Sequence, residues 1–195
     1  MQPTQKEILI MNVKANRSGT KVTTGKCRLS YVHLFEAYAK EGNDPKFSTA
    51  ILIPKTEIDT IKAIKEATIE AAEMGKAKLG KYVLATLKTP LRDGDIEHPD
   101  DENYKGMYFL NASSKNKPGV VDSNVHPILD ASEVYSGCYG RLTINFYAYS
   151  ASGNKGIAAG LGNLQKLAEG EPLGGFTRAE DDFDSVETSN ADFLG

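Results

Sequence analysis

The sequence predicts a mainly β protein that folds as a small Greek-key barrel with one amphipathic helix. Segments rich in β-branched and aromatic residues recur at short intervals between turn signals. A single stretch, residues 56–75, has helical periodicity, and the last two strand-like stretches flank a glycine-containing turn at residues 151–156. This order, with the helix between the third and fourth strands, is typical of the OB-fold. A flat α+β sandwich is the alternative.

Length and composition favour one domain without membrane association. The chain has 195 residues, of which 40% are hydrophobic and 25% charged, as is ordinary for globular proteins. No apolar run approaches the roughly 20 residues that span a bilayer. Only four apolar residues follow Lys6 and Glu7, too few for a signal peptide.

Charge is distributed unevenly along the chain. Residues 179–195 contain six acidic residues and no Lys or Arg. Without them, 20 acids remain against 23 Lys and Arg, so residues 1–178 carry +3 although the whole chain carries −3. A segment with so many acids and so few apolar residues buries too little surface to offset the entropy of ordering. We predict a mildly basic domain, residues 1–178, and a disordered acidic tail, residues 179–195.

Three β-like segments precede the helix. Glu7–Ala15 is apolar and β-compatible, and turn residues follow at Asn16–Gly19. Gly25–Phe35 alternates in the manner of a strand, and Lys46–Ile53 is rich in β-branched and aromatic residues. Pro54 is expected to end this third strand, because proline cannot donate to a sheet ladder.

Thr56–Gly75 is predicted to be an amphipathic helix. Ile58, Ile61 and Ile64 recur every three residues, and Lys and Glu side chains occupy the opposite face. Thr56 is the expected N-cap and Gly75 the expected end.

The loop at residues 90–101 holds a dense group of carboxylates, Asp93, Asp95 and Glu97. It imitates the start of an EF-hand, but His98 stands where the glycine is required and Tyr104 where the closing acid is required. A metal-dependent nuclease or nucleotide-processing enzyme would need acids from several elements. We therefore expect a solvated loop, no metal site and no cofactor, and keep the enzyme as the alternative.

The longest strand-like stretch, residues 135–156, carries two different faces. Successive side chains of a strand point to opposite sides, so Leu142, Ile144 and Phe146 share one core-like face. The other face holds Tyr139, Arg141, Thr143, Asn145, Tyr147 and Tyr149. Aromatic rings beside a guanidinium can stack on bases and hold phosphates, although an ordinary solvent-facing strand favours similar residues. Strands are also expected at residues 104–114 and 156–167, with a basic turn at residues 114–119.

Five sequence motifs, in this order, resemble a family of bacteriophage-encoded single-stranded-DNA-binding proteins long catalogued as of unknown function. The resemblance implies an OB-like fold, a role in protecting single-stranded DNA (ssDNA) during phage replication or recombination, and a location in the bacterial host's cytoplasm. It supplies no DNA-contacting residues. The motifs are RLSYVHLFEA (28–37), PKFSTAILIPK (45–55), PLRDGD (90–95), SGCYGRLTINFYAYS (136–150) and GNKGIAAGLGNLQKLAEGEPLGG (153–175).

We therefore expect a non-enzymatic ssDNA-binding protein whose rings stack on bases while Lys and Arg follow the backbone. The candidate DNA-binding residues are Tyr139, Arg141, Tyr147, Tyr149, Tyr31, Phe47, Arg28, Lys115, Lys117 and Lys155. The acidic tail is expected to dock replication or recombination proteins of the phage or host, and a homodimer is left open. The candidate partner-binding residues of the tail are Asp181, Asp182, Phe183, Asp192 and Phe193.

Overall fold

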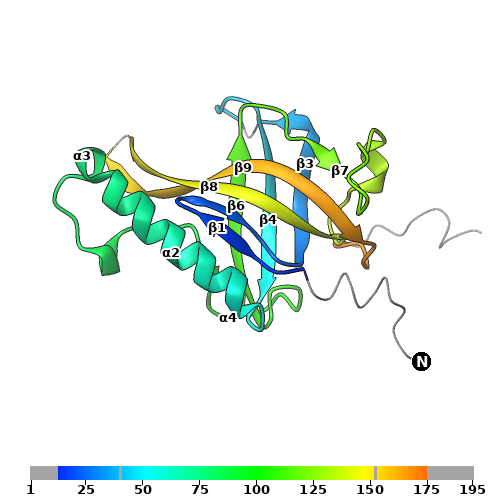
Figure 1. The fold of residues 1–195 in the computed structure, drawn as a ribbon, viewed down its shortest axis with the longest axis horizontal. Coiled ribbons are helices and arrows are strands. Elements are labelled where there is room, and N and C mark those ends of the chain that lie inside the picture. Colours follow the sequence, from blue (N-terminus) through cyan, green and yellow to red (C-terminus); the bar gives the residue numbers. More distant parts are fainter. Residues whose placement is uncertain (1–12, 40, 152, 175–195) are drawn as a thin grey trace, which may run out of the picture.

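The computed structural model describes residues 13–39, 41–151 and 153–174, which form one barrel with a long helix beside it (Figure 1). The strands are β1 (Asn16–Ser18), β2 (Lys21–Thr23), β3 (Cys27–Tyr38), β4 (Lys46–Pro54), β5 (Arg92–Asp93), β6 (Met107–Ser114), β7 (Val120–Val121), β8 (Tyr139–Ala151) and β9 (Asn154–Ala168). The helices are α2 (Ile58–Met74), α3 (Lys76–Leu79) and α4 (Gly94–Glu97), with 3-10 turns η1 (Leu84–Thr86) and η2 (Ala131–Glu133).

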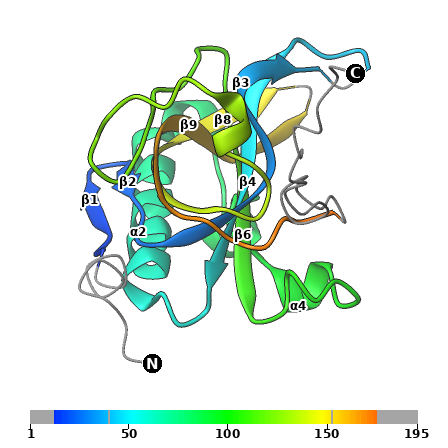
Figure 2. The ribbon, with the colours of Figure 1, turned by 90° about the vertical axis from the view of Figure 1, so that its right-hand side faces the viewer.

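The five main strands close into a barrel. They pair in the order β8, β3, β4, β6, β9, and β9 pairs again with β8. The pairings are antiparallel except that β6 runs parallel to β9, through Ala112 and Ala159. Figure 2, which turns the view by 90°, shows β8, β9 and β3 curving around a common interior. The prediction of an OB-like barrel is therefore confirmed, and the strands do not form the flat sandwich considered as the alternative.

Alternation along β8 supplies much of the core. Leu142, Ile144 and Phe146 are each at most 1% exposed, while the residues between them are half-buried or exposed. The predicted division of this strand into a core face and an outer face is confirmed. Leu29 of β3, Ile51 of β4 and Leu110 of β6 complete the same cluster.

Helix α2 packs its buried side chains, among them Ile61, Ile64 and Ala71, against the sheet at β8 and the β1–β2 hairpin. The prediction of this helix is confirmed, but Thr56 is not its cap. Glu57 occupies the N-cap position without a side-chain capping bond, and Thr56 lies in a turn in which its carbonyl accepts a bond from the Ile58 N–H. Gly75 ends the helix as predicted, and a side chain there would collide with Ala148 of β8.

The sequence pattern missed several short elements. Residues expected as a turn, 16–19, begin a hairpin in which β1 pairs with β2 around Gly19, where φ is +59°. The hairpin adds β2 to the edge of β8 and buries Val22 completely. No helix in the described ranges is long and apolar enough to cross a membrane.

Candidate nucleic-acid interface

A continuous groove crosses the outer face of the barrel. It consists of three depressions of about 590, 390 and 240 Å³. The first and second share Arg92 and Asn111, and the first and third share Tyr31 and Tyr104. The groove therefore runs from the β8–β9 hairpin, across β6, β4 and β3, to the point where the described chain ends at Gly174. We call it the outer groove.

Tyr31 stands in the outer groove because the backbone of β3 is distorted there. The register between β3 and β4 shifts between Ser30 and His33, and Tyr31 has a φ of +49°. A non-glycine residue in this region costs roughly 1–3 kcal/mol, and such strain is concentrated at functional sites. The distortion leaves the Tyr31 ring 68% exposed, where a planar ligand can stack on it.

Two further aromatic side chains lie beside Tyr31. The rings of His33 and Tyr38 stack with centroids 4.6 Å apart and planes 15° apart, and both line the outer groove. Neither residue was among the DNA-binding candidates predicted from the sequence. The signal was present, since Tyr31, His33 and Tyr38 follow one another within one strand, but regular alternation could not predict the shift that brings them together.

Arg92 is the cation at the centre of the outer groove. Its guanidinium carbon lies 4.3 Å from the centroid of the Phe109 ring, and Nη1 donates to Glu97 Oε2 over 3.0 Å. The ring and the carboxylate fix the guanidinium at the junction of the first two depressions. Arg92 was not among the residues predicted from the sequence, because it lies among the acids of the 90–101 loop.

Two predicted residues of β8 complete the far end of the outer groove. Tyr147 and Tyr149 line the second depression together with Lys88 and Arg92, and Tyr147 is 45% exposed. Of the predicted residues, Tyr31, Tyr147 and Tyr149 are thus brought into one groove, from β3 and β8.

Arg28, Tyr139 and Arg141 lie elsewhere. Arg28 donates to the carbonyls of Gly137 (3.2 Å) and Glu171 (2.7 Å), and its guanidinium lies 5.9 Å from the centroid of the Tyr139 ring. Arg28 therefore holds the segment that follows β9 against β3. Arg141 Nε donates to Gln165 Oε1 over 2.8 Å. At about 3.3 Å per residue, Arg141 is about 20 Å along β8 from Tyr147.

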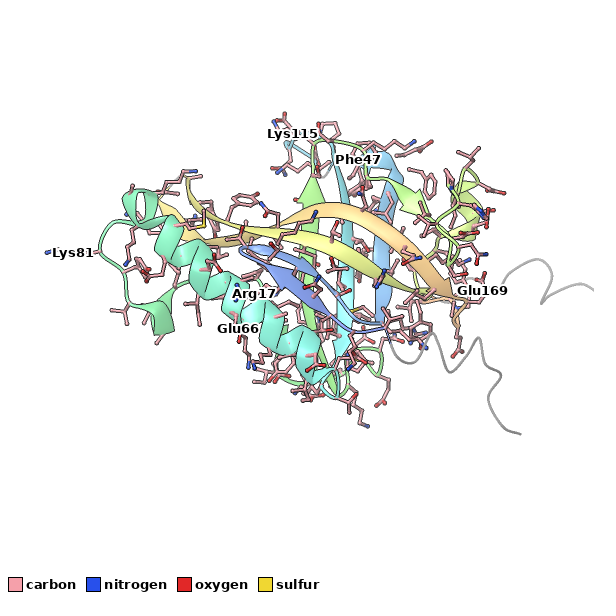
Figure 3. All side chains as sticks on the ribbon, viewed as in Figure 1. Arg17, Phe47, Glu66, Lys81, Lys115 and Glu169 are labelled. Carbon is pink, nitrogen blue, oxygen red and sulfur yellow. The ribbon has the colours of Figure 1, made fainter. Side chains whose placement is uncertain are left out.

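The remaining predicted residues are also outside the three depressions. Figure 3 shows Phe47 and Lys115 together at the upper end of the sheet, where Lys115 pairs with Asp44 at 3.3 Å and Phe47 packs half-buried against the core. Lys117 lies 5.8 Å from the centroid of the Phe35 ring. Lys155 donates to the carbonyl of Leu79 at the end of α3, over 3.0 Å.

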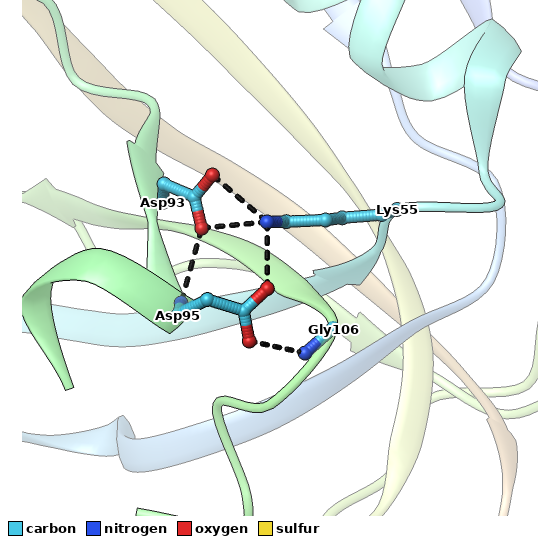
Figure 4. A network of polar contacts seen from close by, with 4 residues as sticks. All are labelled: Lys55, Asp93, Asp95 and Gly106. Atoms are coloured by element: carbon cyan, nitrogen blue, oxygen red, sulfur yellow. Dashed lines mark hydrogen bonds and ion pairs between the residues drawn. The ribbon is translucent and has the colours of Figure 1, made fainter. Parts of the chain in front are cut away.

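Residues 95–100 of the acidic loop are exposed, as expected of a solvated loop, but the carboxylates of Asp93 and Asp95 are paired with a lysine that directly follows β4. Lys55 Nζ lies 2.7 Å from both Asp93 Oδ1 and Asp95 Oδ2, and the Gly106 N–H donates to Asp95 Oδ1 (Figure 4). These bonds lower the pKa of Asp95, with Lys55 the larger cause, and they raise the pKa of Lys55. Among the described residues, no group of three His, Cys, Asp or Glu side chains could hold a metal ion.

The predicted tail residues Asp181, Asp182, Phe183, Asp192 and Phe193 lie outside the described residues. The described chain ends beside the outer groove, because Leu173 and Gly174 line its third depression with Tyr31. Leu173 is fixed there by its N–H bond to the carbonyl of Ser136 (2.7 Å) and by packing against Tyr104 and Phe109.

Replacing Tyr31 by glycine separates its backbone strain from its ring. Glycine adopts a positive φ without steric cost, and little ring surface is buried, so Tyr31→Gly is expected to leave the free energy of unfolding unchanged or raise it. It should weaken ssDNA binding by about 1–3 kcal/mol if the ring stacks on a base. Urea unfolding and fluorescence titration measure the two effects. A marked loss of stability would show that the ring supports the fold instead.

Comparisons with known proteins identify the family of this chain. Residues 20–194 match the family described as Enterobacter phage Enc34, ssDNA-binding protein. Protein p50 of the Acyrthosiphon pisum secondary endosymbiont phage 1 is 31% identical over 183 residues, which cover 89% of this chain and 98% of that protein.

Solved structures show the same fold. The ssDNA-binding protein of bacteriophage Enc34, in complex with ssDNA, is 26% identical with a TM-score of 0.72 over 83% of this chain and 98% of that one. Bacteriophage T7 gp2.5, an ssDNA-binding protein, is 14% identical with a TM-score of 0.52 over 85% of this chain and 98% of that one, a likeness of fold alone. The resemblance inferred from the motifs is confirmed: the chain belongs to the family of the Enc34 ssDNA-binding protein.

Proposed function

We propose that the protein is a non-enzymatic ssDNA-binding protein that coats and protects ssDNA during phage DNA replication or recombination in the host cytoplasm. The outer groove carries this proposal, since it places exposed Tyr rings on either side of a fixed guanidinium. Stacking needs bases with free faces, which single strands offer and duplexes do not. Family membership supports the same reading.

Within the outer groove, Tyr31, Tyr147 and Tyr149 are the proposed stacking residues, and Arg92 the proposed phosphate or base-edge contact. If bound ssDNA extends beyond the outer groove, it would contact the other candidate residues. Tyr139, Arg28 and Arg141 lie toward the end of β9, Phe47, Lys115 and Lys117 at the β3–β4 and β6–β7 turns, and Lys155 beside α3.

Preference for single strands tests the proposal directly. In gel-shift titrations at physiological salt, the full chain is expected to bind a mixed-sequence ssDNA more tightly than the matching duplex, and to bind ssDNAs of different sequence alike. Equal affinity for duplex and single strand would contradict it. Incubation with magnesium and labelled ssDNA is the control for the enzyme alternative, and magnesium-dependent cleavage would overturn the non-enzymatic assignment.

The acidic tail, residues 179–195, is proposed to dock a replication or recombination partner and to compete with DNA for the outer groove. Its tether supports competition, because the described chain ends in the third depression of that groove. A short tether gives a high effective concentration of the six acids along the outer groove, whose cations are Arg92 and Lys88.

Deleting residues 179–195 is therefore expected to tighten ssDNA binding, most at low salt, where screening is weakest. Fluorescence titrations of the full and shortened chains at two salt concentrations measure this. An affinity no tighter after deletion at low salt would contradict competition. Partner docking is tested separately, by whether the shortened chain still binds the replication proteins that the full chain binds.

A further inference from the structure

A rigid turn at residues 122–126 projects from the β7 end of the barrel. Asp122 Oδ1 accepts bonds from the N–H groups of Asn124 and His126, each 2.8 Å long. The Asp122 N–H donates to the His126 carbonyl (2.8 Å), and the Val125 N–H to the Asp122 carbonyl (3.1 Å). The backbone bonds from His126 and Asn124 also lower the pKa of Asp122, so the carboxylate that holds the turn stays ionised.

This turn presents apolar side chains to solvent. Val125 has a φ of +67°, a conformation that is a genuine outlier for a β-branched residue. It is 68% exposed, and Leu129, four residues on, is 87% exposed. A strained backbone conformation that holds an apolar side chain in solvent indicates a contact surface. We call residues 122–133 the apolar knob.

The opposite end of the molecule has a depression of about 330 Å³ between the end of α2, α3 and β8. Ala71, Ala77 and Phe146 are among its lining residues, and Met74, also in its lining, is 75% exposed. The contact of Gly75 with Ala148 brings the helix end directly onto the strand. We call this depression the α3 pocket.

The knob and the pocket have complementary charge. Asp130 and Glu133 are exposed on the knob, and neither has a basic partner among the described residues. Lys78 lines the α3 pocket, and Lys81 extends into solvent beyond α3 (Figure 3). An acidic apolar knob and a basic apolar pocket are each unsuited to contact a second copy of themselves, but they suit one another.

Their placement excludes contact within one molecule. Figure 1 shows α3 at one end of the longest axis and β7 at the other, and in Figure 2 the segment between β7 and β8 faces the viewer. The outer groove runs between these ends. One of its ends lies at Tyr149 and Lys88 near the α3 pocket, and the other at Ser136, three residues after the knob.

We propose that the apolar knob of one copy enters the α3 pocket of the next, so that copies associate head to tail along one DNA strand. Such a contact is heterologous, so each bound copy leaves a free knob at one end and a free pocket at the other, and further copies add along the strand instead of stopping at a dimer. It makes ssDNA binding cooperative on long strands. This inference rests on the proposed function and extends it, because the knob lies outside the outer groove and the α3 pocket shares only Tyr147 with it.

The test compares a one-site oligonucleotide with long poly(dT). The knob variant Leu129→Glu and the pocket variant Met74→Glu are expected to bind the one-site oligonucleotide like the wild type, because neither residue lines the outer groove. On poly(dT) each variant should lose about tenfold or more in cooperativity, since burial of a Leu or Met contact is replaced by burial of a charge. Ile58→Glu, at another exposed apolar residue (64%) at the start of α2, is the control and should keep wild-type cooperativity.

Mixing the two variants identifies a head-to-tail contact. On a two-site oligonucleotide, Leu129→Glu and Met74→Glu together should form a cooperative pair, because one intact knob and one intact pocket remain, whereas either alone should not. Circular dichroism checks that both variants are folded. Non-cooperative binding by the wild type, wild-type cooperativity in both single variants, or no cooperative pair in the mixture would overturn the proposal. Failure of the wild type to bind the one-site oligonucleotide would instead overturn the proposed function.

Discussion

Leu142→Ala is expected to lower the free energy of unfolding by about 2–5 kcal/mol, the range for removing a fully buried leucine from a core. Leu142 is 1% exposed, lies opposite Leu164 across the β8–β9 ladder, and donates its N–H to Thr24 Oγ1 over 3.1 Å. It therefore stands where β8, β9 and the segment after β2 meet, and the surrounding strands cannot collapse into the space without breaking the barrel.

Urea denaturation measures this loss, and Thr143→Ala is the neighbouring control. Thr143 is half-buried on the outer face of the same strand, where its Oγ1 accepts the Asn163 N–H over 2.8 Å, so its replacement should cost about the 0.5–1.5 kcal/mol of one hydrogen bond, less than that of Leu142. The binding variant Tyr147→Ala belongs to the outer face too, and should also remain folded. If Leu142→Ala stayed stable while Tyr147→Ala unfolded, the two faces of β8 would be inverted.

The architecture could be predicted because it depends on local periodicity. Alternation between residues 139 and 149 fixes which face of β8 is buried, and the change of period at residues 58–74 identifies α2. The boundaries of the helices and strands, and the short elements, were harder to predict from the sequence. The β1–β2 hairpin has strands of three residues each, and it is held largely by pairing with β8, more than 115 residues away; no local pattern contains that information.

The candidate site was only partly predictable, because barrel curvature and one backbone irregularity decide it. The outer face of β8 is continuous in sequence, yet only Tyr147 and Tyr149 reach the outer groove, while Arg141 turns toward Gln165. Tyr31 reaches the groove through a register shift that no alternation rule predicts. Arg92 was hidden because its acidic neighbours are neutralised by Lys55, a residue that is distant in sequence.

Arg28 was also predicted to contact DNA because its contacts to residues distant in sequence cannot be read from the local pattern. It is a half-buried arginine on a strand, the type of residue that holds phosphates. In the structure its donors bond two carbonyls, one of them in the segment that leads to the tail. We interpret it as a residue that positions the start of the tail beside the outer groove. If Arg28 only positions the tail, replacing it should change ssDNA binding only while the tail is present. If Arg28 contacts DNA directly, replacing it should weaken binding with or without the tail.

Removing the stacking and cationic groups of the outer groove is expected to weaken ssDNA binding strongly. Tyr147→Ala and Tyr149→Ala should each cost about 1–3 kcal/mol if their rings stack on bases. Combining Tyr147→Ala with Tyr31→Ala, in different depressions of the groove, should give nearly additive losses, since residues without shared partners act independently. Fluorescence titration against a one-site oligonucleotide measures each loss.

Arg92→Ala should act differently from the tyrosine variants, because it removes charge. Each phosphate contact on a single strand contributes about 0.7 to the slope of log affinity against log salt concentration, so this variant should reduce that slope by about 0.7, whereas Tyr147→Ala should leave it unchanged. Arg141→Ala is the matched comparison. Arg141 lies on the outer face of β8, as Tyr147 does, but it is hydrogen-bonded to Gln165 outside the outer groove. A slope reduced by Arg141→Ala and unaffected by Arg92→Ala would mean that DNA follows β8 toward residue 139 and not the outer groove, because only a cation that contacts a phosphate displaces counterions from the DNA on binding.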